Sequence, residues 1–319
     1  MNRKSLSRRV TARLGTVQCM KPHLTPTTAL LLTVPPLMWA GNAVVGRMVG
    51  PLVPPMTLNL LRWALAFVLL LPLAASVLRP GSGLWAYWRR FAMLGLLSVG
   101  AYNALQYLAL HTSTPINVTL VAASGPVWML AIGRLFFGAG VSRRQLLGAV
   151  LSICGVLLVL SRGRLEFLLQ LRLVPGDLYV LLAIIAWSFY SWMLTQPGKE
   201  PPPIRQDWAA FLLAQIFFGL GWSALFAAGE WALTDAHIIW SWPLAGALLF
   251  VAVGPALLAY RCWGAGIQRA GPTMAGFFAN LTPLFAAVLS AALLNETPHA
   301  YHVAAFALIV GGIVVSSRR

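Results

Sequence analysis

The C-terminal segment Gly271–Arg319, GPTMAGFFANLTPLFAAVLSAALLNETPHAYHVAAFALIVGGIVVSSRR, contains two apolar runs separated by the polar stretch Asn295-Glu296-Thr297-Pro298. Two prolines and a glycine of this segment recur, without a gap, 157 positions earlier in the chain: Pro115 for Pro272, Pro126 for Pro283, and Gly155 for Gly312. Proline and glycine set backbone geometry, so this shared spacing indicates a shared backbone path. The pattern predicts an internal duplication.

The composition around this segment predicts an all-α integral membrane protein. Of the 319 residues, 59 % are hydrophobic and 9 % are charged, and the mean hydropathy is +0.77. Soluble domains carry about 25 % charged residues. Lys and Arg (23) outnumber Asp and Glu (7), which in a soluble protein would suggest a nucleic-acid partner. In a membrane protein the excess marks cytoplasmic helix ends near anionic headgroups, so no nucleic-acid partner is expected.

Apolar runs long enough to cross a membrane follow one another along the chain. A bilayer core about 30 Å thick is crossed by roughly 20 apolar residues of helix. Ten runs qualify, near residues 28–47, 56–76, 91–110, 116–137, 145–161, 177–195, 208–228, 244–263, 273–294 and 299–316. The basic segment 1–27 is predicted to be cytoplasmic and is not a secretory signal. A chain starting at Met20 would have the more natural N-terminus.

Ten spans place both termini on one side of the membrane. With the N-terminus inside, most Lys and Arg residues fall in cytoplasmic segments, as the positive-inside rule requires; those between 162 and 172 are the exception. Five spans per half invert the second half relative to the first, as in many secondary transporters, whose substrate site lies near the midplane. The predicted domains are a first repeat at 28–161, a linker at 162–176 and a second repeat at 177–317, around a central cavity.

Ionisable residues are scarce within the predicted spans. Arg62 lies about two turns into the second span, Arg47 closes the first, and Glu296 ends the ninth. A charge at such a place is expensive and is by default a functional candidate. An inward-facing Arg62 would neutralise a substrate carboxylate. The alternative is that the arginines snorkel to the headgroups and that Glu296 is a solvated helix end.

Amides and aromatic residues share several spans. Amides such as Asn42 and Asn280 need partners that hydrocarbon does not offer, so they either join helices or face a wet cavity. Trp39 lies three residues before Asn42, and Trp187 three before Tyr190, which puts each pair on one helix face. Such a mixture suits a cavity for a small polar or aromatic metabolite. The candidate lining is Trp39, Asn42, Arg62, Tyr102, Gln106, Trp187, Tyr190, Tyr260 and Asn280, and Trp263 either joins it or belongs to an interfacial belt.

Signatures of enzymes and metal sites were not found in the sequence. It has no His-Glu-x-x-His, Gly-x-Ser-x-Gly or P-loop motif, and its three cysteines are widely spaced. His299 and His302 lie on one helix face, with Glu296 as the carboxylate nearby. No catalytic residue, metal site or cofactor is predicted.

Several short motifs, taken in order and spacing, resemble one family. They are Leu37-Met38-Trp39-Ala40-Gly41-Asn42, Leu61-Arg62-Trp63, Gly176-Asp177-Leu178, Ala186-Trp187-Ser188, Gln268-Arg269-Ala270-Gly271-Pro272, Asn280-Leu281-Thr282-Pro283 and Asn295-Glu296. On these residues, and over 28–317, the chain resembles the EamA-type ten-helix members of the drug/metabolite transporter (DMT) superfamily. That family usually carries Glu at the end of both the fourth and the ninth span. Here Glu296 holds the second place, but Ala139 stands in the first.

The resemblance implies two inverted five-helix repeats around a central cavity, a location in the bacterial plasma membrane, and export or exchange of small metabolites such as amino acids. We expect a secondary transporter working by alternating access, with a small-molecule solute and the lipid bilayer as its partners. Two alternatives stay open: a lipid or glycolipid flippase of the same fold, and a membrane-embedded enzyme acting on lipid-linked substrates. The shortage of carboxylates within the spans counts against the enzyme.

Overall fold

The computed structural model describes residues 24–113, 115–161, 163–164, 166, 174–196, 198–294 and 300–318. The N-terminal segment with Met20, most of the predicted linker, and Glu296 with His299 lie outside the described residues. The described residues form helices and turns, with no β-strand among them. Seven of these helices are long and apolar enough to cross a membrane, and Gly125–Phe136 is a shorter apolar helix. The protein is therefore an all-helical, multi-pass membrane protein.

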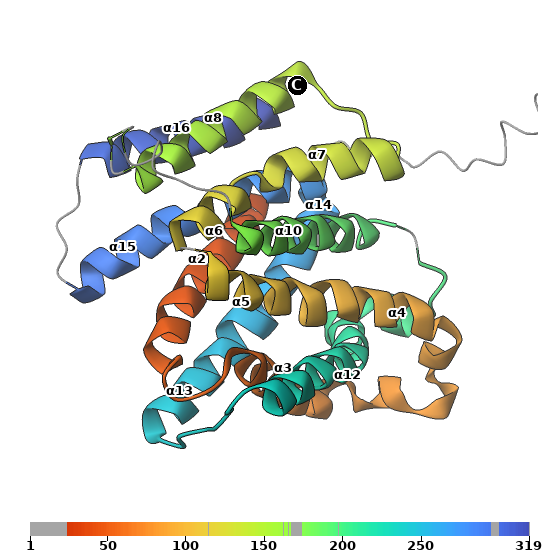
Figure 1. Cartoon of the computed structure of the whole chain (residues 1–319). Helices are drawn as coiled ribbons and strands as arrows, with labels where there is room; N and C mark the ends of the chain where they lie inside the picture. The colour runs from red at the N-terminus through yellow and green to blue at the C-terminus, as the bar shows by residue number, and fades with distance from the viewer. Residues whose placement is uncertain are drawn as a thin grey trace, which may run out of the picture.

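The helices follow the order of the predicted spans (Figure 1). The first half contains α2 (Pro26–Val49), α3 (Pro55–Ala74), α4 (Trp88–Gly95), α5 (Tyr102–Thr112), α6 (Pro115–Ala122), α7 (Gly125–Phe136) and α8 (Arg143–Leu160). The second half contains α10 (Pro175–Met193), α11 (Pro202–Gln206), α12 (Trp208–Leu233), α13 (Trp242–Val251), α14 (Ala259–Ala279), α15 (Thr282–Leu294) and α16 (Ala300–Ser317). Short 3-10 turns, η1 (Ala75–Leu78), η2 (Pro80–Ser82) and η3 (Leu84–Tyr87), connect α3 to α4. Two π-helices, η4 (Leu96–Ala101) and η5 (Ala252–Leu258), join α4 to α5 and α13 to α14.

Side chains that satisfy the first backbone N–H groups determine where several helices begin. The Ser142 hydroxyl accepts from the Gln145 N–H, and the Gln145 side chain accepts from the Ser142 N–H, a capping box at the start of α8. The Asp207 carboxylate caps α12 by accepting from the N–H groups of Ala209 and Ala210. The polar residues between the apolar runs therefore define where these helices begin.

The two halves interrupt their helices at equivalent places. A two-residue turn at 123–124 separates α6 from α7, and a turn at 280–281, which is 157 residues later, separates α14 from α15. A proline ring clashes with the carbonyl four residues before it. For Pro126 and Pro283 these carbonyls belong to the last residues of α6 and α14. The equivalent bends predicted from the two prolines are therefore present.

The eighth predicted span is longer than expected. It was predicted to end at residue 263, but the helix continues to Gly271, where φ is 82° and the chain turns before Pro272. A positive φ is adopted by glycine without steric strain. The segment beyond 263 is less apolar, which hid it from a hydropathy criterion, and one of its polar side chains, that of Gln268, lines a cavity.

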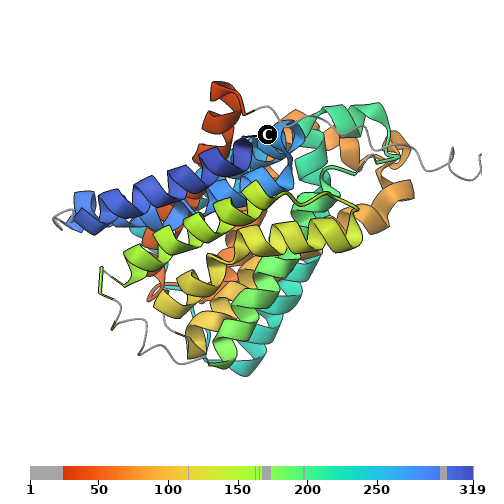
Figure 2. The ribbon, with the colours of Figure 1, turned by 90° about the horizontal axis from the view of Figure 1, so that it is seen from above.

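The last helices of the two halves, α8 and α16, lie side by side in both views of the ribbon (Figures 1 and 2). A Cβ added to Gly148 would lie 2.9 Å from the Ser316 Cβ, whereas one added to Gly155 would lie 2.7 Å from Ile309 Cγ1. Higher numbers on α8 therefore face lower numbers on α16, so the two helices are antiparallel. Small residues at such an interface let helix backbones approach closely within a membrane.

Gly312→Ala is expected to destabilise the protein, because its Cβ would lie 2.6 Å from the Gly148 carbonyl oxygen. Overpacking of this kind costs about 1–3 kcal/mol, and the expected readout is a lower midpoint of thermal unfolding in detergent. The matched control is Gly311→Ala, since a Cβ there meets no atom within 4 Å and alanine favours a helix over glycine. Equal melting temperatures for the two variants would contradict the close packing of α8 and α16.

The other central helix pairs are also antiparallel. On α3 and α12, the Asn59 amide donates to Ser223, whereas Phe67 packs against Phe217. Along α2 and α14, Leu32 lies against Gly266, whereas Trp39 lies against Trp263. The centre of the molecule is therefore enclosed by α2, α3, α5, α10, α12 and α14, three helices from each half.

Candidate functional site

An aromatic cluster lies at the centre of these helices, with Trp187 of α10 at its middle. Five rings lie with their centroids 4.8–5.5 Å from the Trp187 ring: Trp39 (5.3 Å), Tyr102 (4.8 Å), Tyr190 (5.0 Å), Tyr260 (5.5 Å) and Trp263 (5.4 Å). We call these six residues the aromatic cluster. Trp63 of α3 extends it by an edge-to-face contact with Tyr260 at 4.9 Å. These spacings are typical of favourable aromatic pairs, and the rings come from both halves of the chain.

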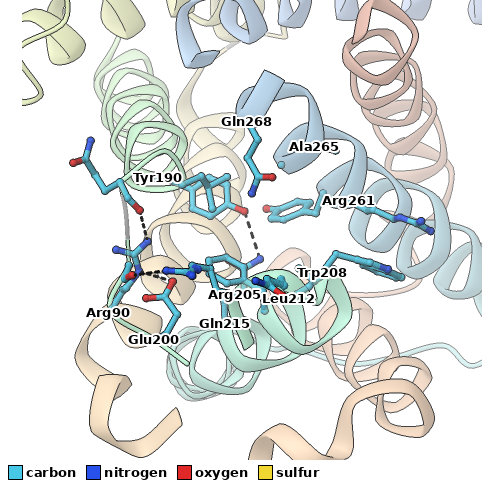
Figure 3. Close-up of a pocket in the computed structure, with 17 residues that line it drawn as sticks. Arg90, Tyr190, Glu200, Arg205, Trp208, Leu212, Gln215, Arg261, Ala265 and Gln268 are labelled. Atoms are coloured by element: carbon cyan, nitrogen blue, oxygen red, sulfur yellow. Dashed lines mark hydrogen bonds and ion pairs between the residues drawn. The ribbon is translucent and has the colours of Figure 1, made fainter. Parts of the chain in front are cut away.

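A cavity of about 410 Å³ opens next to the cluster. Tyr190 and Tyr260 belong both to the cluster and to the cavity lining, and the Gln215 amide donates to the Tyr190 hydroxyl at 3.4 Å. Figure 3 shows Gln215 and Tyr190 joined in this way, with Gln268 reaching toward them from α14. The cavity therefore combines aromatic faces with amide groups, a mixture that binds amphipathic small molecules.

Charged side chains surround the mouth of this cavity. Arg90 of α4 donates to the carbonyls of Met193 and Gln196 at 3.3 and 3.2 Å, and its Nε lies 3.7 Å from a Glu200 carboxylate oxygen. Arg205 donates to the Gly198 carbonyl, and the Arg261 guanidinium stacks on the Trp208 ring at 4.4 Å (Figure 3). We call this end of the bundle the Arg90 end. With three arginines and one glutamate, the mouth is positively charged.

Arg62 of α3 lies buried next to the cluster. It is 4 % exposed, its Nη2 donates to the Asn59 amide oxygen at 2.6 Å, and its guanidinium carbon lies 5.2 Å from the centre of the Trp63 ring. Trp63 in turn contacts the Tyr260 ring, which connects Arg62 to the cluster. Among the described residues the ion pair present is Arg90–Glu200, so Arg62 has no carboxylate partner there. Arg62 faces the protein interior and does not snorkel to the headgroups.

The opposite end of the bundle is held by Glu230, at the far end of α12. Its carboxylate accepts from the Met56 N–H at 3.0 Å, from the Thr57 N–H at 2.8 Å and from the Thr57 hydroxyl at 2.8 Å. The Trp231 indole N–H donates to the same hydroxyl at 2.8 Å. These bonds satisfy free N–H groups at the start of α3 and place a negative charge at its positive end. They tie α3 to α12 at what we call the Glu230 end.

The structure brings six of the nine sequence-predicted residues together directly. Trp39, Tyr102, Trp187, Tyr190 and Tyr260 belong to the aromatic cluster, and Arg62 lies beside it. Gln106 is half-buried, one turn after Tyr102, and close enough to interact with the Tyr102 hydroxyl. Asn42 is half-buried on α2, one turn after Trp39. Nothing is described for Glu296 or for the Arg47 side chain.

Asn280 lies elsewhere, at the contact between the two halves. Its amide donates to the Ala123 carbonyl at 3.2 Å and to the Ser152 hydroxyl at 2.9 Å. Ala123 is the position 157 residues before Asn280, so this amide bridges the equivalent turns of the two halves. Asn280 does not line the cavity described above. Of the two roles open for span amides, its contacts are those of a residue that joins helices.

Asn280→Ala is expected to lower stability by about 1–2 kcal/mol, because it removes two interhelical hydrogen bonds of roughly 0.6 kcal/mol or more each in a membrane protein and leaves buried partners unsatisfied. The measurement is thermal unfolding in detergent. Asn42→Ala serves as the control, since no described residue hydrogen-bonds the Asn42 side chain. A melting temperature of Asn280→Ala equal to that of wild type would contradict a bridging role.

Sequence reasoning missed four residues of this region. Trp263, which is fully buried in the cluster, was left open between the cavity and an interfacial belt. Its position three residues after Tyr260 was the available signal, since that spacing shares a helix face. Gln215 is one of the span amides for which both roles stay open in the sequence, and Trp63 stands in a family motif without a role. Asn59 gave no signal, because its role comes from neighbours on other helices. The described residues contain no group of three potential metal ligands.

Comparison with known proteins agrees with this architecture. A sequence model of the EamA-like transporter family matches the chain twice, over residues 26–161 and 174–318. The aromatic amino acid exporter YddG of Ancylobacter novellus is 23 % identical, over 88 % of this chain and 93 % of its own. A probable amino-acid metabolite efflux pump of Salmonella typhimurium is 26 % identical, over 90 % and 93 %.

A further sequence relative and a solved structure are also similar to this chain. The uncharacterized transporter YyaM of Bacillus subtilis is 25 % identical, over 71 % of this chain and 72 % of its own. A crystal structure of another protein superposes with a TM-score of 0.71, at 22 % identity, over 90 % of this chain and 95 % of that one, and so shares the fold. The relatives are named as transporters, which points to a non-enzyme. Because the family model matches most of the sequence in two copies, the chain belongs to the EamA-like transporter family of the DMT superfamily.

Proposed function

We propose that this protein is a secondary transporter that exports small metabolites with an aromatic part, by alternating access. The observation that supports this most strongly is the cavity floored by Tyr190 and Tyr260, which opens toward a charged mouth and ends at a packed aromatic cluster. Aromatic faces bind an apolar ring, and the amides of Gln215 and Gln268 bind polar substituents. The opposite end of the bundle is held together by Glu230. A cavity accessible from one end is the arrangement expected of one state in the transport cycle.

The proposed topology has ten spans in two inverted repeats, 28–161 and 177–317. Two matches to one family model support a duplication. The antiparallel packing of α8 with α16, and of α3 with α12, supports an inverted relation, since an inversion axis between equivalent helices makes them antiparallel. The concentration of arginines at the Arg90 end supports a cytoplasmic position for that end and for both termini, by the positive-inside rule.

Amino acids and related metabolites are the proposed solute class. Two relatives are named for aromatic amino acids and for amino-acid metabolites, and the aromatic cluster of this chain suits a solute with a ring. Export is the proposed direction, because those relatives are an exporter and an efflux pump, and because the cavity opens at the end assigned to the cytoplasm.

Transport by the purified protein in liposomes tests this proposal. Vesicles preloaded with unlabelled L-tryptophan and placed in trace labelled L-tryptophan should accumulate the label by exchange, with and without an imposed pH gradient. L-Alanine, which lacks a ring, should exchange far less. Exchange no faster than in protein-free vesicles, for aromatic and aliphatic amino acids alike, would contradict the proposed function.

A lipid flippase is the second candidate, and a groove of about 460 Å³ between α7 and α8 is the feature that favours it. Apolar side chains such as Leu130, Leu146 and Ile153 line this groove, so it suits an acyl chain. It shares no lining residue with the cavity at the aromatic cluster. Flipping of a fluorescent phospholipid in the same vesicles distinguishes the two candidates, and we expect none above the protein-free level.

A further inference from the structure

We propose that Arg62 binds the carboxylate of the transported solute, so that the site selects aromatic carboxylates over aromatic amines. This inference rests on the proposed transport function and adds the charge class of the solute to it. Three observations carry it: the uncompensated charge of Arg62, the unpartnered N–H donors around Tyr260, and the positive mouth at the Arg90 end.

The charge of Arg62 is compensated by no described acidic group. A buried ionised side chain is costly unless it is paired and hydrogen-bonded, and within a membrane it marks a functional site. Arg62 is 4 % exposed, and its one hydrogen bond to a side chain goes to the neutral amide oxygen of Asn59. Its Nε has no hydrogen-bond partner. An anionic solute would supply both the missing charge and the missing acceptor.

The orientation of Arg62 is set by Asn59. The Asn59 amide nitrogen donates to the Val99 carbonyl at 3.1 Å and to the Ser223 hydroxyl at 3.2 Å. The other end of the amide, its oxygen, therefore faces Arg62 and holds Nη2. With Nη2 held, Nε stays available to a ligand, and a guanidinium is the side chain best suited to binding a carboxylate.

Further donors without partners lie around Tyr260. The indole nitrogens of Trp63 and Trp187 are buried and unpartnered, and their rings lie 4.9 and 5.5 Å from the Tyr260 ring. Buried polar groups without partners are uncommon and call for an explanation such as a ligand. Together with Arg62, the region offers three N–H donors and no described carboxylate.

The acceptors of the same region are neutral. Gln215 Oε1 and the Ser188 hydroxyl oxygen are also buried without partners. They can accept from the ammonium group of an amino acid, but they offer no negative charge to offset a solute that is only a cation. Arg62 would repel such a cation. Amino acids and simple aromatic acids therefore fit the site, whereas aromatic amines do not.

The route to Arg62 starts at the Arg90 end. Glu200 offsets Arg90, which leaves Arg205 and Arg261 to attract anions into the mouth. Arg62 does not line the cavity, whereas Tyr260 does. The solute thus meets the Tyr190–Tyr260 floor first, and its carboxylate reaches Arg62 when Tyr260 moves aside during the change of state.

The test compares three indole probes that differ in charge: L-tryptophan, indole-3-propionate (a carboxylate without an amine) and tryptamine (an amine without a carboxylate). Each is measured as influx into proteoliposomes containing wild type, Arg62→Gln or Arg62→Lys. We expect wild type to transport both carboxylates at least about 10-fold faster than tryptamine. Arg62→Gln should lower the two carboxylate rates by about 10- to 100-fold and leave tryptamine unchanged or faster, while Arg62→Lys restores part of the carboxylate rate.

Arg134→Gln is the matched control, since Arg134 is an exposed arginine on α7 and its loss should alter none of the three rates. A structural role of Arg62 would lower all three rates together and would overturn the inference. Wild-type protein that transports tryptamine as fast as the carboxylates would also overturn the inference, and this measurement does not depend on the folding of any variant. Transport of none of the probes by wild type would instead contradict the proposed function itself.

Discussion

Trp187→Ala is expected to reduce aromatic amino acid exchange in proteoliposomes by about tenfold or more. Trp187 is the one ring in contact with all five others of the aromatic cluster. An aromatic pair contributes about 0.5–1.5 kcal/mol, and roughly 1.4 kcal/mol is a factor of ten. Removing this ring takes away its contacts with Tyr190 and Tyr260, and so loosens the two tyrosines of the cavity lining that we propose bind the solute.

Two further variants separate this effect from general damage. Trp187→Phe keeps an aromatic ring and should retain much more exchange than Trp187→Ala. Trp242→Ala removes a tryptophan that is 90 % exposed at the start of α13, and it should exchange at the wild-type rate. Trp187→Ala that folds and transports as well as Trp242→Ala would show that the cluster is only packing.

Glu230→Gln is expected to open the Glu230 end of the bundle. The carboxylate accepts three hydrogen bonds from the start of α3. In the glutamine variant an NH2 group takes the place of one of the two carboxylate oxygens, and this donor then faces the N–H and O–H donors of α3. A hydrogen bond to a charged group contributes about 1.5–3 kcal/mol. A loss of about 2 kcal/mol shifts a two-state equilibrium by roughly 30-fold, so the state open at this end should become far more populated.

Accessibility of the α3–α12 contact measures this shift. Ser223, which is 1 % exposed and hydrogen-bonded to Asn59, is changed to cysteine in a chain whose own cysteines are replaced by serine. Alkylation of this cysteine by a polar maleimide should be slow with Glu230 present and much faster in Glu230→Gln. Asp235→Asn changes an exposed acid near the same end and should not alter the rate. Equal rates for both variants would rule out Glu230 as the bond that closes this end.

The pattern of apolar runs and the positions of proline and glycine predicted much of the fold. The prolines at 126 and 283 and the glycines at 155 and 312 indicated a duplication, and the structure breaks or packs its helices at these places. Apolar runs predicted a multi-pass membrane protein, because a membrane requires about 20 apolar residues per helix, and seven of the described helices are long and apolar enough to cross one. The helix of the eighth predicted span was the exception, since it continues past residue 263 through a polar segment whose Gln268 lines a cavity.

The candidate site was predicted in part. Spacings of three placed Trp39 with Asn42 and Trp187 with Tyr190, and both tryptophans belong to the cluster. The roles of the amides were harder to predict, because Asn280 and Gln215 are both amide side chains within apolar runs. Asn280 bridges two turns between the halves, whereas Gln215 lines the cavity. A helix that is apolar all round carries no sign of which face meets lipid and which meets protein.

The chain's own residues were enough to establish a helical membrane protein and to predict two related halves with an arginine and several aromatic residues within the spans. Burial in lipid and the geometry of proline and glycine act locally along the sequence. The partners of those residues followed from the folded arrangement alone. Trp63 joins Tyr260, Asn59 orients Arg62, and Glu230 binds the start of α3 from a helix more than 170 residues away. Such contacts depend on how antiparallel helices align, and helix alignment is a property of the packed molecule that no local pattern of residues encodes.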